Sequence, residues 1–530
     1  MEKIFQKLYQ LLKREAPSHP PRGEENTIRM ASLPLGGAGG GLWSVWGGSA
    51  LFLLILLSAC TPHPENVKHS DVFPEIYPDY IGVTIPANIA PMNFNAADEA
   101  VEHMEVTARG SKGGEIHTNG EWAAFDQDEW QELTQQNVGG EIRFTVCMLK
   151  DGQWTEYQTF AMYVSTCPLE DYGITYRRIP PGYEVGGNIG IYQRDLHSFK
   201  ETAILQESAV PGQCMNCHTA NRTDPKQFYL HLRGSHGGTV IQQDGQRRWL
   251  ETKTSETIGA TAHGCWHPDG RFIAFSLSPV AQAFYVGTER LIEPFDLKSD
   301  MLMLDVETDE LIRTPLLETE DYETFPNFSA DGKKLFFSSA KYYQVPASVD
   351  SIRYSLCTIE FDTKTGCWGT KVDTLLDAQT EGKSFTFPRA SYDGKWLMYC
   401  QTDFGMFPVD HPEGDLWLMD LQTGERRALE EVNSNDAESY HSWSSNSHWF
   451  VFTSRRGDGM YTQLYLSCID ENGKVGKPFL LPQQNPRKYY MEMFDAYNCP
   501  DFTKTKVDFN MREVRQEVFS DKRIQVKIKP

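Results

Sequence analysis

Two short motifs recur in phase through the second half of the chain, and they restrict its fold more than any other feature of the sequence. The first motif is a tight turn that leads into an apolar stretch, and it occurs at residues 267–276, 329–338, 391–400 and 444–453. Its first three copies contain Asp-Gly pairs spaced 62 residues apart, whereas the fourth has Asn446-Ser447 instead. Glycine adopts positive φ without steric cost, so each Asp-Gly predicts a turn followed by a β-strand.

The second motif is a strand that runs through an aspartate into a polar turn. Its aspartates are spaced by 57, 58 and 50 residues, and they are Asp305, Asp362, Asp420 and Asp470. Two hairpins in each period make one four-stranded blade, and repeated blades make a β-propeller. Unrelated hairpins in an ordinary β-sandwich are the alternative, but they would not keep two motifs in phase over four copies.

Two further outer hairpins precede these repeats. They comprise residues 190–196 with 200–205, and residues 239–242 with 248–251. Together with the four repeats they predict six blades within residues 169–486. Residues 487–530 are expected to form a C-terminal tail, in which the alternating stretch 524–528 could close the ring by adding a strand to the first blade.

Residues 214–218 read Cys-Met-Asn-Cys-His, which is the attachment pattern of c-type haem. The thiols of Cys214 and Cys217 would bond to the porphyrin vinyl groups, and His218 would bind the iron as the proximal ligand. A zinc site would need further ligands nearby, and a thioredoxin-like redox pair would follow a strand in a βαβ unit. The flanking sequence fits neither alternative well, so residues 207–236 are predicted to form a haem-binding insertion in the propeller.

The sequence leaves the sixth iron ligand open. His231 and His236 are nearest to the attachment motif and lie on or beside a predicted strand, so they are the first candidates. His263 and His267 come next, whereas Met215 is too close to the motif to reach the far face of the haem. A five-coordinate iron is the alternative, and it would open the site to small-molecule binding or peroxidase-like chemistry.

An apolar run at residues 51–57 has the length of a signal peptide and is too short to cross a bilayer as a helix. It ends in Leu-Ser-Ala-Cys, which resembles the lipobox of bacterial lipoproteins and implies cleavage before Cys60 and lipidation of that residue. Residues 1–59 are therefore expected to be a signal peptide with an N-terminal extension, and residues 60–70 a lipid-anchored tether. This predicts a lipoprotein of the bacterial outer membrane that faces the periplasm, where haem c is attached.

Between the tether and the repeats, residues 71–168 read as short alternating strands without a long helix. The clearest strand candidates are residues 81–85, 104–108, 141–146 and 153–157. About 100 residues of this pattern predict a small immunoglobulin-like β-sandwich. The mature chain is thus expected to be all-β, with this sandwich preceding the propeller.

Charge and missing motifs limit the classes of function. The chain has a formal net charge of −22, and removing residues 1–59, which hold six Lys/Arg and four Asp/Glu, makes it −24. Such a protein has no net attraction to nucleic acid, and its redox partners are expected to present basic faces. The sequence contains no Gly-x-Ser-x-Gly elbow, Walker motif or dinucleotide-binding glycine pattern. These observations favour an electron carrier or a binding protein over an enzyme.

The repeats resemble those of TolB-like propellers, whose signature is Pro-x-Phe-Ser-Pro-Asp-Gly before an apolar strand. Residues 325–332 read Phe-Pro-Asn-Phe-Ser-Ala-Asp-Gly, with one departure, and residues 387–394 read Phe-Pro-Arg-Ala-Ser-Tyr-Asp-Gly, with two. The resemblance covers residues 260–480 and is specific for fold rather than function. With the stretches 173–177, 211–218 and 266–270, the chain is similar to a group of Bacteroidetes lipoproteins that combine such repeats with a haem attachment motif.

Two classes of function remain open from the sequence. The first is a membrane-anchored, mono-haem c-type cytochrome that transfers electrons to a protein partner docked on the propeller. The second is a protein- or glycan-binding propeller scaffold of the cell envelope, in which the haem is secondary.

Overall fold

The computed structural model describes residues 62–180, 189–285 and 292–529, which belong to one compact unit. The predicted signal peptide and the predicted lipidation site, Cys60, lie outside these described residues. Within the described ranges no helix is long and apolar enough to span a membrane.

The N-terminal part is a small β-domain with one helix. Its main sheet has seven strands: β1 (Lys68–His69), β8 (Gln153–Glu156), β7 (Glu141–Lys150), β5 (Val101–Gly110), β6 (Glu115–Gly120), β3 (Thr84–Ile85) and β9 (Phe160–Val164). A second sheet pairs β2 (Ile76–Tyr77) with β4 (Asn95–Ala96). The four strands expected from the sequence overlap β3, β5, β7 and β8, whereas the other strands of the domain were not predicted. The immunoglobulin-like arrangement stays a prediction.

The helix of this domain was not expected from the sequence. It is α2 (Gln127–Gln136), and it begins at Asp126, whose side chain accepts hydrogen bonds from the backbone of Asp128 and Glu129. Only Trp130, Leu133 and Thr134 are buried in it. An apolar stripe this short is a weak periodic signal, so the sequence pattern did not reveal it.

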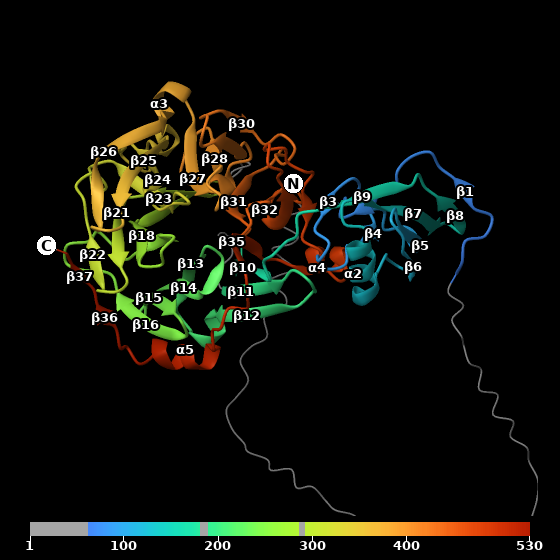
Figure 1. Cartoon of the computed structure of the whole chain (residues 1–530), viewed down its shortest axis with the longest axis horizontal. Coiled ribbons are helices and arrows are strands. Elements are labelled where there is room, and N and C mark those ends of the chain that lie inside the picture. Colours follow the sequence, from blue (N-terminus) through green and yellow to red (C-terminus); the bar gives the residue numbers. More distant parts are fainter. Residues whose placement is uncertain (1–61, 181–188, 286–291, 530) are drawn as a thin grey trace, which may run out of the picture. The chain divides into compact units, whose positions relative to one another are not determined.

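Six blades follow, each built on four antiparallel strands, and they confirm the predicted six-bladed propeller (Figure 1). From the outer to the inner strand, blade 1 is β12 (Glu201–Gln206), β11 (Gly190–Asp195), β10 (Gly173–Ile179) and β35 (Ala496–Thr503). Blade 2 is β16 (Gln246–Glu251), β15 (Gly238–Gln243), β14 (Asp224–Arg233) and β13 (Cys214–Asn221). Blade 3 is β22 (Glu310–Ile312), β21 (Asp300–Asp305), β18 (Phe272–Leu277) and β17 (Ala262–Trp266).

The last three blades have the same order. Blade 4 is β26 (Cys367–Leu376), β25 (Ser355–Asp362), β24 (Lys334–Ala340) and β23 (Tyr322–Phe328). Blade 5 is β30 (Arg426–Ala428), β29 (Asp415–Asp420), β28 (Trp396–Thr402) and β27 (Ser384–Ala390). Blade 6 is β34 (Phe479–Leu480), β33 (Gln463–Cys468), β32 (Trp449–Ser454) and β31 (Glu438–Trp443). The six inner strands contact one another in a ring around a central channel.

Residues 207–236 belong to the repeat itself. They supply β13 and β14, the two inner strands of blade 2, so the haem attachment motif lies on an inner strand of the ring rather than in an added loop. A true insertion occurs in blade 3, where the hairpin of β19 (Val280–Phe284) and β20 (Ile292–Asp296) separates β18 from β21.

The ring is closed by β35, not by the stretch predicted for this purpose. Strand β35 pairs antiparallel with β10 and completes blade 1. The expected closing stretch instead forms β36 (Ile524–Gln525) and β37 (Lys527–Ile528), which extend the outer edges of blades 2 and 3. Its alternating pattern was read correctly as strand, but pattern alone does not identify the partner edge. The remaining helices are α3 (Ala378–Glu381), α4 (Pro486–Glu492) and α5 (Met511–Val518).

The recurrent turns connect each inner strand to the second strand of its blade. Gly270, Gly332 and Gly394 have φ of 80°, 72° and 77°, which explains why glycine recurs there. In the fourth copy, Ser447 takes the same left-handed conformation with φ of 61°. The local sequence therefore sets the hairpin that starts each blade.

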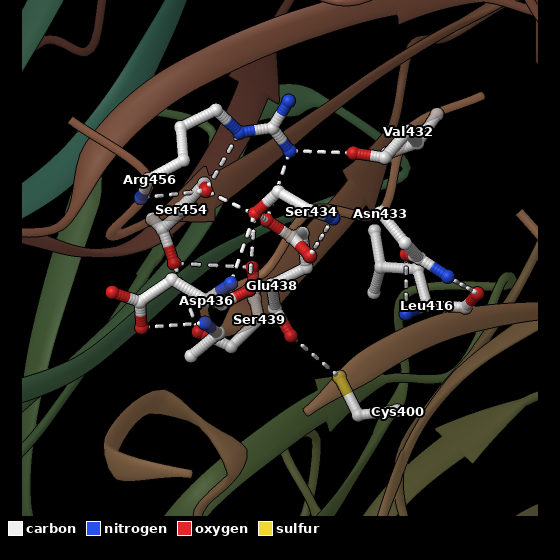
Figure 2. Close-up of polar contacts among 12 residues, drawn as sticks. Cys400, Leu416, Val432, Asn433, Ser434, Asp436, Glu438, Ser439, Ser454 and Arg456 are labelled. Atoms are coloured by element: carbon white, nitrogen blue, oxygen red, sulfur yellow. Dashed lines mark hydrogen bonds and ion pairs between the residues drawn. The ribbon is translucent and has the colours of Figure 1, made fainter. Parts of the chain in front are cut away.

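A buried polar cluster holds the start of β31 in blade 6 (Figure 2). The Glu438 carboxylate, which is fully buried, accepts hydrogen bonds from Ser434 Oγ and Ser454 Oγ, both at 2.7 Å, and pairs with Arg456 at 2.9 Å. Burial raises the pKa of Glu438, while Arg456 and the hydroxyls oppose that rise. Because each polar group in the cluster has a partner, the cluster fixes the start of this inner strand.

Candidate functional site in the central channel

Every inner strand carries a β-bulge at the same level of the channel. The register shifts place the bulges at residues 216–217, 263–264, 325–326, 387–388, 440–441 and 499–500. In five of them the first residue has positive φ: His263, Phe325, Phe387, Tyr440 and Cys499. The bulge residues line a narrow cavity of about 50 Å³, which we call the waist of the channel.

The bulge in β13 brings both cysteines of the haem motif to one side of the strand. In a regular strand, residues three apart point to opposite faces. One extra residue reverses this alternation, and Cys214 and Cys217 accordingly line the same cavity of about 330 Å³, which we call the upper cavity.

His218 follows the bulge and lines the waist. Its side chain is 95% buried, and among the described residues the only hydrogen-bonding influence on the ring is a weak one from the Thr175 backbone. Burial, together with the charges of Arg177 and Arg389, lowers the pKa of His218 to about 3. The imidazole is therefore neutral at neutral pH, which is the form that binds metals.

Cys217 has an activated thiol. Burial raises its pKa, but the charge and hydrogen bonds of His263 outweigh that effect and lower the pKa to about 6. The His263 backbone N–H donates to Cys217 Sγ at 3.2 Å. A large thiolate fraction at neutral pH makes this sulfur a competent nucleophile.

The two histidines first considered as sixth ligands lie elsewhere. His231 is buried in blade 2, where its Nδ1 lies 2.9 Å from Thr239 Oγ1, and it lines none of the channel cavities. His236 is paired with Asp521 of the C-terminal tail at 2.6 Å.

Among the other candidates, His267 Nε2 lies 3.0 Å from the Gly332 carbonyl oxygen, outside the waist and the upper cavity. His263, in contrast, lines both. The sequence contains a signal for this. Six residues before the Asp or Asn of each turn, the four repeats carry His263, Phe325, Phe387 and Tyr440. Aligning the repeats would have placed His263 on the channel.

The walls of the upper cavity combine apolar and charged groups. Arg177, Arg233 and Arg455 line it, as do Val280 and Ile292 of the inserted hairpin and one acidic residue, Asp410, which pairs with Arg455. Guanidinium groups bind carboxylates well because their planar fork can donate two parallel hydrogen bonds. The cavity therefore suits a largely apolar molecule that carries carboxylates.

A buried histidine near the inserted hairpin is held by two glutamates. His411 Nε2 lies 3.0 Å from Glu293 of β20, and its Nδ1 lies 3.0 Å from Glu413. Burial lowers the pKa of His411, but the two carboxylates outweigh it and raise the pKa to about 9. Asp410 and Arg455 form a second ion pair beside this one, at 3.4 Å.

We expect this network to make the protein less stable at alkaline pH. Since the folded-state pKa of His411 is raised from 6.5 to about 9, its contribution of about 3 kcal/mol is complete below pH 6.5 and is lost as the pH rises through 9. Urea unfolding between pH 6 and 10 measures it. The variant His411→Gln should flatten that pH dependence, and an unchanged profile in the variant would contradict the assignment.

Comparisons with known proteins leave the function open. No protein-family model and no curated protein matches the chain. Among solved structures, it is similar to a putative 6-phosphogluconolactonase from Bacteroides fragilis, with 11% identity over 59% of this chain and 83% of that chain, at a TM-score of 0.28. The periplasmic gluconolactonase PpgL from Pseudomonas aeruginosa gives 13% identity over 59% and 97%, at 0.28.

Prolyl oligopeptidase B from Galerina marginata gives 12% identity over 73% of this chain and 53% of that chain, at a TM-score of 0.31. The chain thus spans about half the length of this peptidase. Such low similarities say nothing about activity, and the six blades are established by the chain's own sheet topology.

Proposed function

We propose that this chain is a membrane-anchored, mono-haem c-type cytochrome that carries electrons in the bacterial cell envelope. The haem would be attached to Cys214 and Cys217 and lie in the upper cavity, with His218 as an axial ligand. The observation that carries the proposal is the bulge in β13, which directs both thiols into one cavity next to the buried imidazole of His218.

The residues present fit this cofactor in three further respects. The thiol of Cys217 is activated for addition to a vinyl group, and the imidazole of His218 is neutral. Arg177 and Arg233 would supply donors for the two propionates, whereas Arg455 is already paired with Asp410. No cluster of three or more His, Cys, Asp or Glu side chains that could hold a metal ion occurs among the described residues. A haem iron needs only one or two protein ligands, because the porphyrin supplies four.

His263 is the best candidate for the sixth ligand. It lines the waist with His218 and the upper cavity with the two cysteines. Its ring also packs against Phe325, at 4.8 Å between ring centroids, and against Phe407, at 5.8 Å, which restricts its orientation. When bound, haem supplies a one-electron Fe(II)/Fe(III) couple, and the protein would tune its potential through the axial ligands and the apolar cavity.

The predicted anchor completes the proposal. Lipidation of Cys60 would hold the protein at the outer membrane, facing the periplasm, where it would exchange electrons with a partner that presents a basic face. The polar segment after Cys60 would act as a tether.

One experiment tests the cofactor and the anchor together. The full chain is produced in a bacterial host with cytochrome c maturation machinery and purified from membranes. We expect a pyridine haemochrome spectrum of one haem c per chain, and an intact mass that includes covalent haem, cleavage before Cys60 and acyl chains. Protein without covalent haem would refute the cytochrome and favour the binding scaffold, and an intact N-terminus upstream of Cys60 would refute the anchor.

A further inference from the structure

Below the waist, the channel ends in a small chamber of about 40 Å³. We call it the lower chamber, and the polar residues that matter for its chemistry are Thr219, Arg222, Asn327, Arg389 and Ser442. Arg222 lies in the turn between β13 and β14 and reaches across to two other blades. Its Nη1 donates to the Ala330 carbonyl oxygen at 3.3 Å and its Nη2 to the Tyr392 carbonyl oxygen at 3.0 Å.

Arg389 separates the lower chamber from the waist, and it lines both. It directly follows the bulge of β27, as His218 follows the bulge of β13. Its guanidinium group makes no hydrogen bond or ion pair with any described residue, although its charge is felt by groups on other blades. Burial raises the pKa of Asp501, for example, and Arg389 is the first group that opposes this rise.

Asp501 does not neutralise Arg389 directly. Its Oδ2 accepts hydrogen bonds from Thr219 Oγ1 at 2.7 Å and from the Ala220 backbone N–H at 3.4 Å. No contact within 4 Å joins the Asp501 carboxylate to the Arg389 guanidinium, and Asp501 does not line the lower chamber. A partly buried guanidinium without a bound anion is costly, because it loses hydration and the Asp501 carboxylate compensates its charge only from beyond ion-pairing distance.

A second side chain also points to a missing ligand. Ser442 is 97% buried and lines the lower chamber, and its hydroxyl has no hydrogen-bond partner. The Asn327 amide is already engaged, since its Nδ2 donates to Cys265 Sγ at 3.5 Å and its Oδ1 accepts from the Ala390 backbone N–H at 2.9 Å. Buried hydroxyls are usually satisfied, so an unpaired one facing a cavity indicates a bound molecule.

We propose that the lower chamber binds a small oxyanion between Arg389 and Arg222, with Ser442 donating a further hydrogen bond. Two guanidinium groups share the chamber and no carboxylate lines it, in a chain whose net charge is −22. A volume of about 40 Å³ admits an anion of a few atoms, such as acetate or inorganic phosphate. The inference does not depend on the haem, since none of these three residues belongs to the attachment motif.

Calorimetric titration of the purified full-length protein tests this inference. Sodium acetate and sodium phosphate are titrated separately at constant ionic strength, with sodium chloride as the reference. We expect saturable one-site binding of at least one oxyanion and a rise of the melting temperature with its concentration. Preference for acetate assigns the chamber to carboxylates, and preference for phosphate assigns it to phosphate groups. Absence of saturable binding by both anions would overturn the proposal.

Three variants locate the site. Arg389→Met should weaken binding at least tenfold, and Ser442→Ala should weaken it severalfold without changing the charge of the chain. Arg426→Met is the matched control, because Arg426 lies in the same blade but pairs with Glu381 away from the channel. Equal affinities in Arg389→Met and Arg426→Met would refute the site. If Arg389→Met does not fold, Ser442→Ala decides, and wild-type affinity in that variant would refute it.

Discussion

Replacing both Cys214 and Cys217 with serine is expected to yield a folded protein without covalently attached haem. Both thiols line the upper cavity, and serine differs from cysteine by one atom, so the propeller should tolerate the change. The loss of covalent haem should be complete, because the thioether bonds have no other source in the motif. Haem staining after denaturing electrophoresis measures it, and circular dichroism checks the fold.

Cys499→Ser provides the matched control for this experiment. Cys499 lines both the waist and the upper cavity but lies on β35, outside the motif. This variant should keep its full complement of covalent haem. Covalent haem in the double serine variant, or its loss from Cys499→Ser, would show that the attachment site is misassigned.

The spin state of the haem, rather than the amount of haem, distinguishes the histidines that would bind the iron. His218→Ala should leave the thioether bonds possible but change the spin state and shift the reduction potential. If His263 is the sixth ligand, His263→Ala should convert a low-spin spectrum to a high-spin one, whereas His231→Ala should not, since His231 lies outside the channel cavities. The opposite result for His231 and His263 would contradict the structural assignment.

Ending the chain after Phe494 is expected to abolish cooperative folding. The truncation removes β35, which is the inner strand of blade 1, and leaves the edge of β10 without its partner. It also removes Tyr497 and Phe502, both almost fully buried. Losing a buried aromatic side chain costs about 3–5 kcal/mol. Two such losses approach the total stability of about 5–15 kcal/mol that is typical of a domain, before the lost strand pairing is considered.

A shorter truncation is the control for closure. Ending the chain after Ser520 removes β36 and β37, which only extend the outer edges of blades 2 and 3 by two residues each. This variant should stay folded and lose only part of its stability, chiefly through Val526, which is buried. Thermal unfolding followed by circular dichroism compares the two variants. A cooperative transition in the variant that ends after Phe494 would show that β35 is dispensable for the ring.

The sequence by itself determined the repeating unit. Asp-Gly turns followed by apolar strands, in phase with a second hairpin motif, predicted four blades, and two further outer hairpins upstream brought the number to the six that the structure shows. These features are encoded locally, because a tight turn and an alternating strand depend on neighbouring residues. The haem attachment pattern is equally local, and it was visible as five consecutive residues.

Only the tertiary structure decided which distant residues meet. Closure by β35 was not visible in the sequence, because residues 496–503 show no regular alternation and include a proline. The choice of partner strand depends on contacts hundreds of residues apart. Nearness in sequence favoured His231 and His236 as ligands, yet His231 lies on β14, the second strand of its blade, and His236 in the turn after it, so neither lines the channel. His263 and Arg389, from other blades, face the channel because equivalent bulges on the inner strands direct their side chains to the same axis.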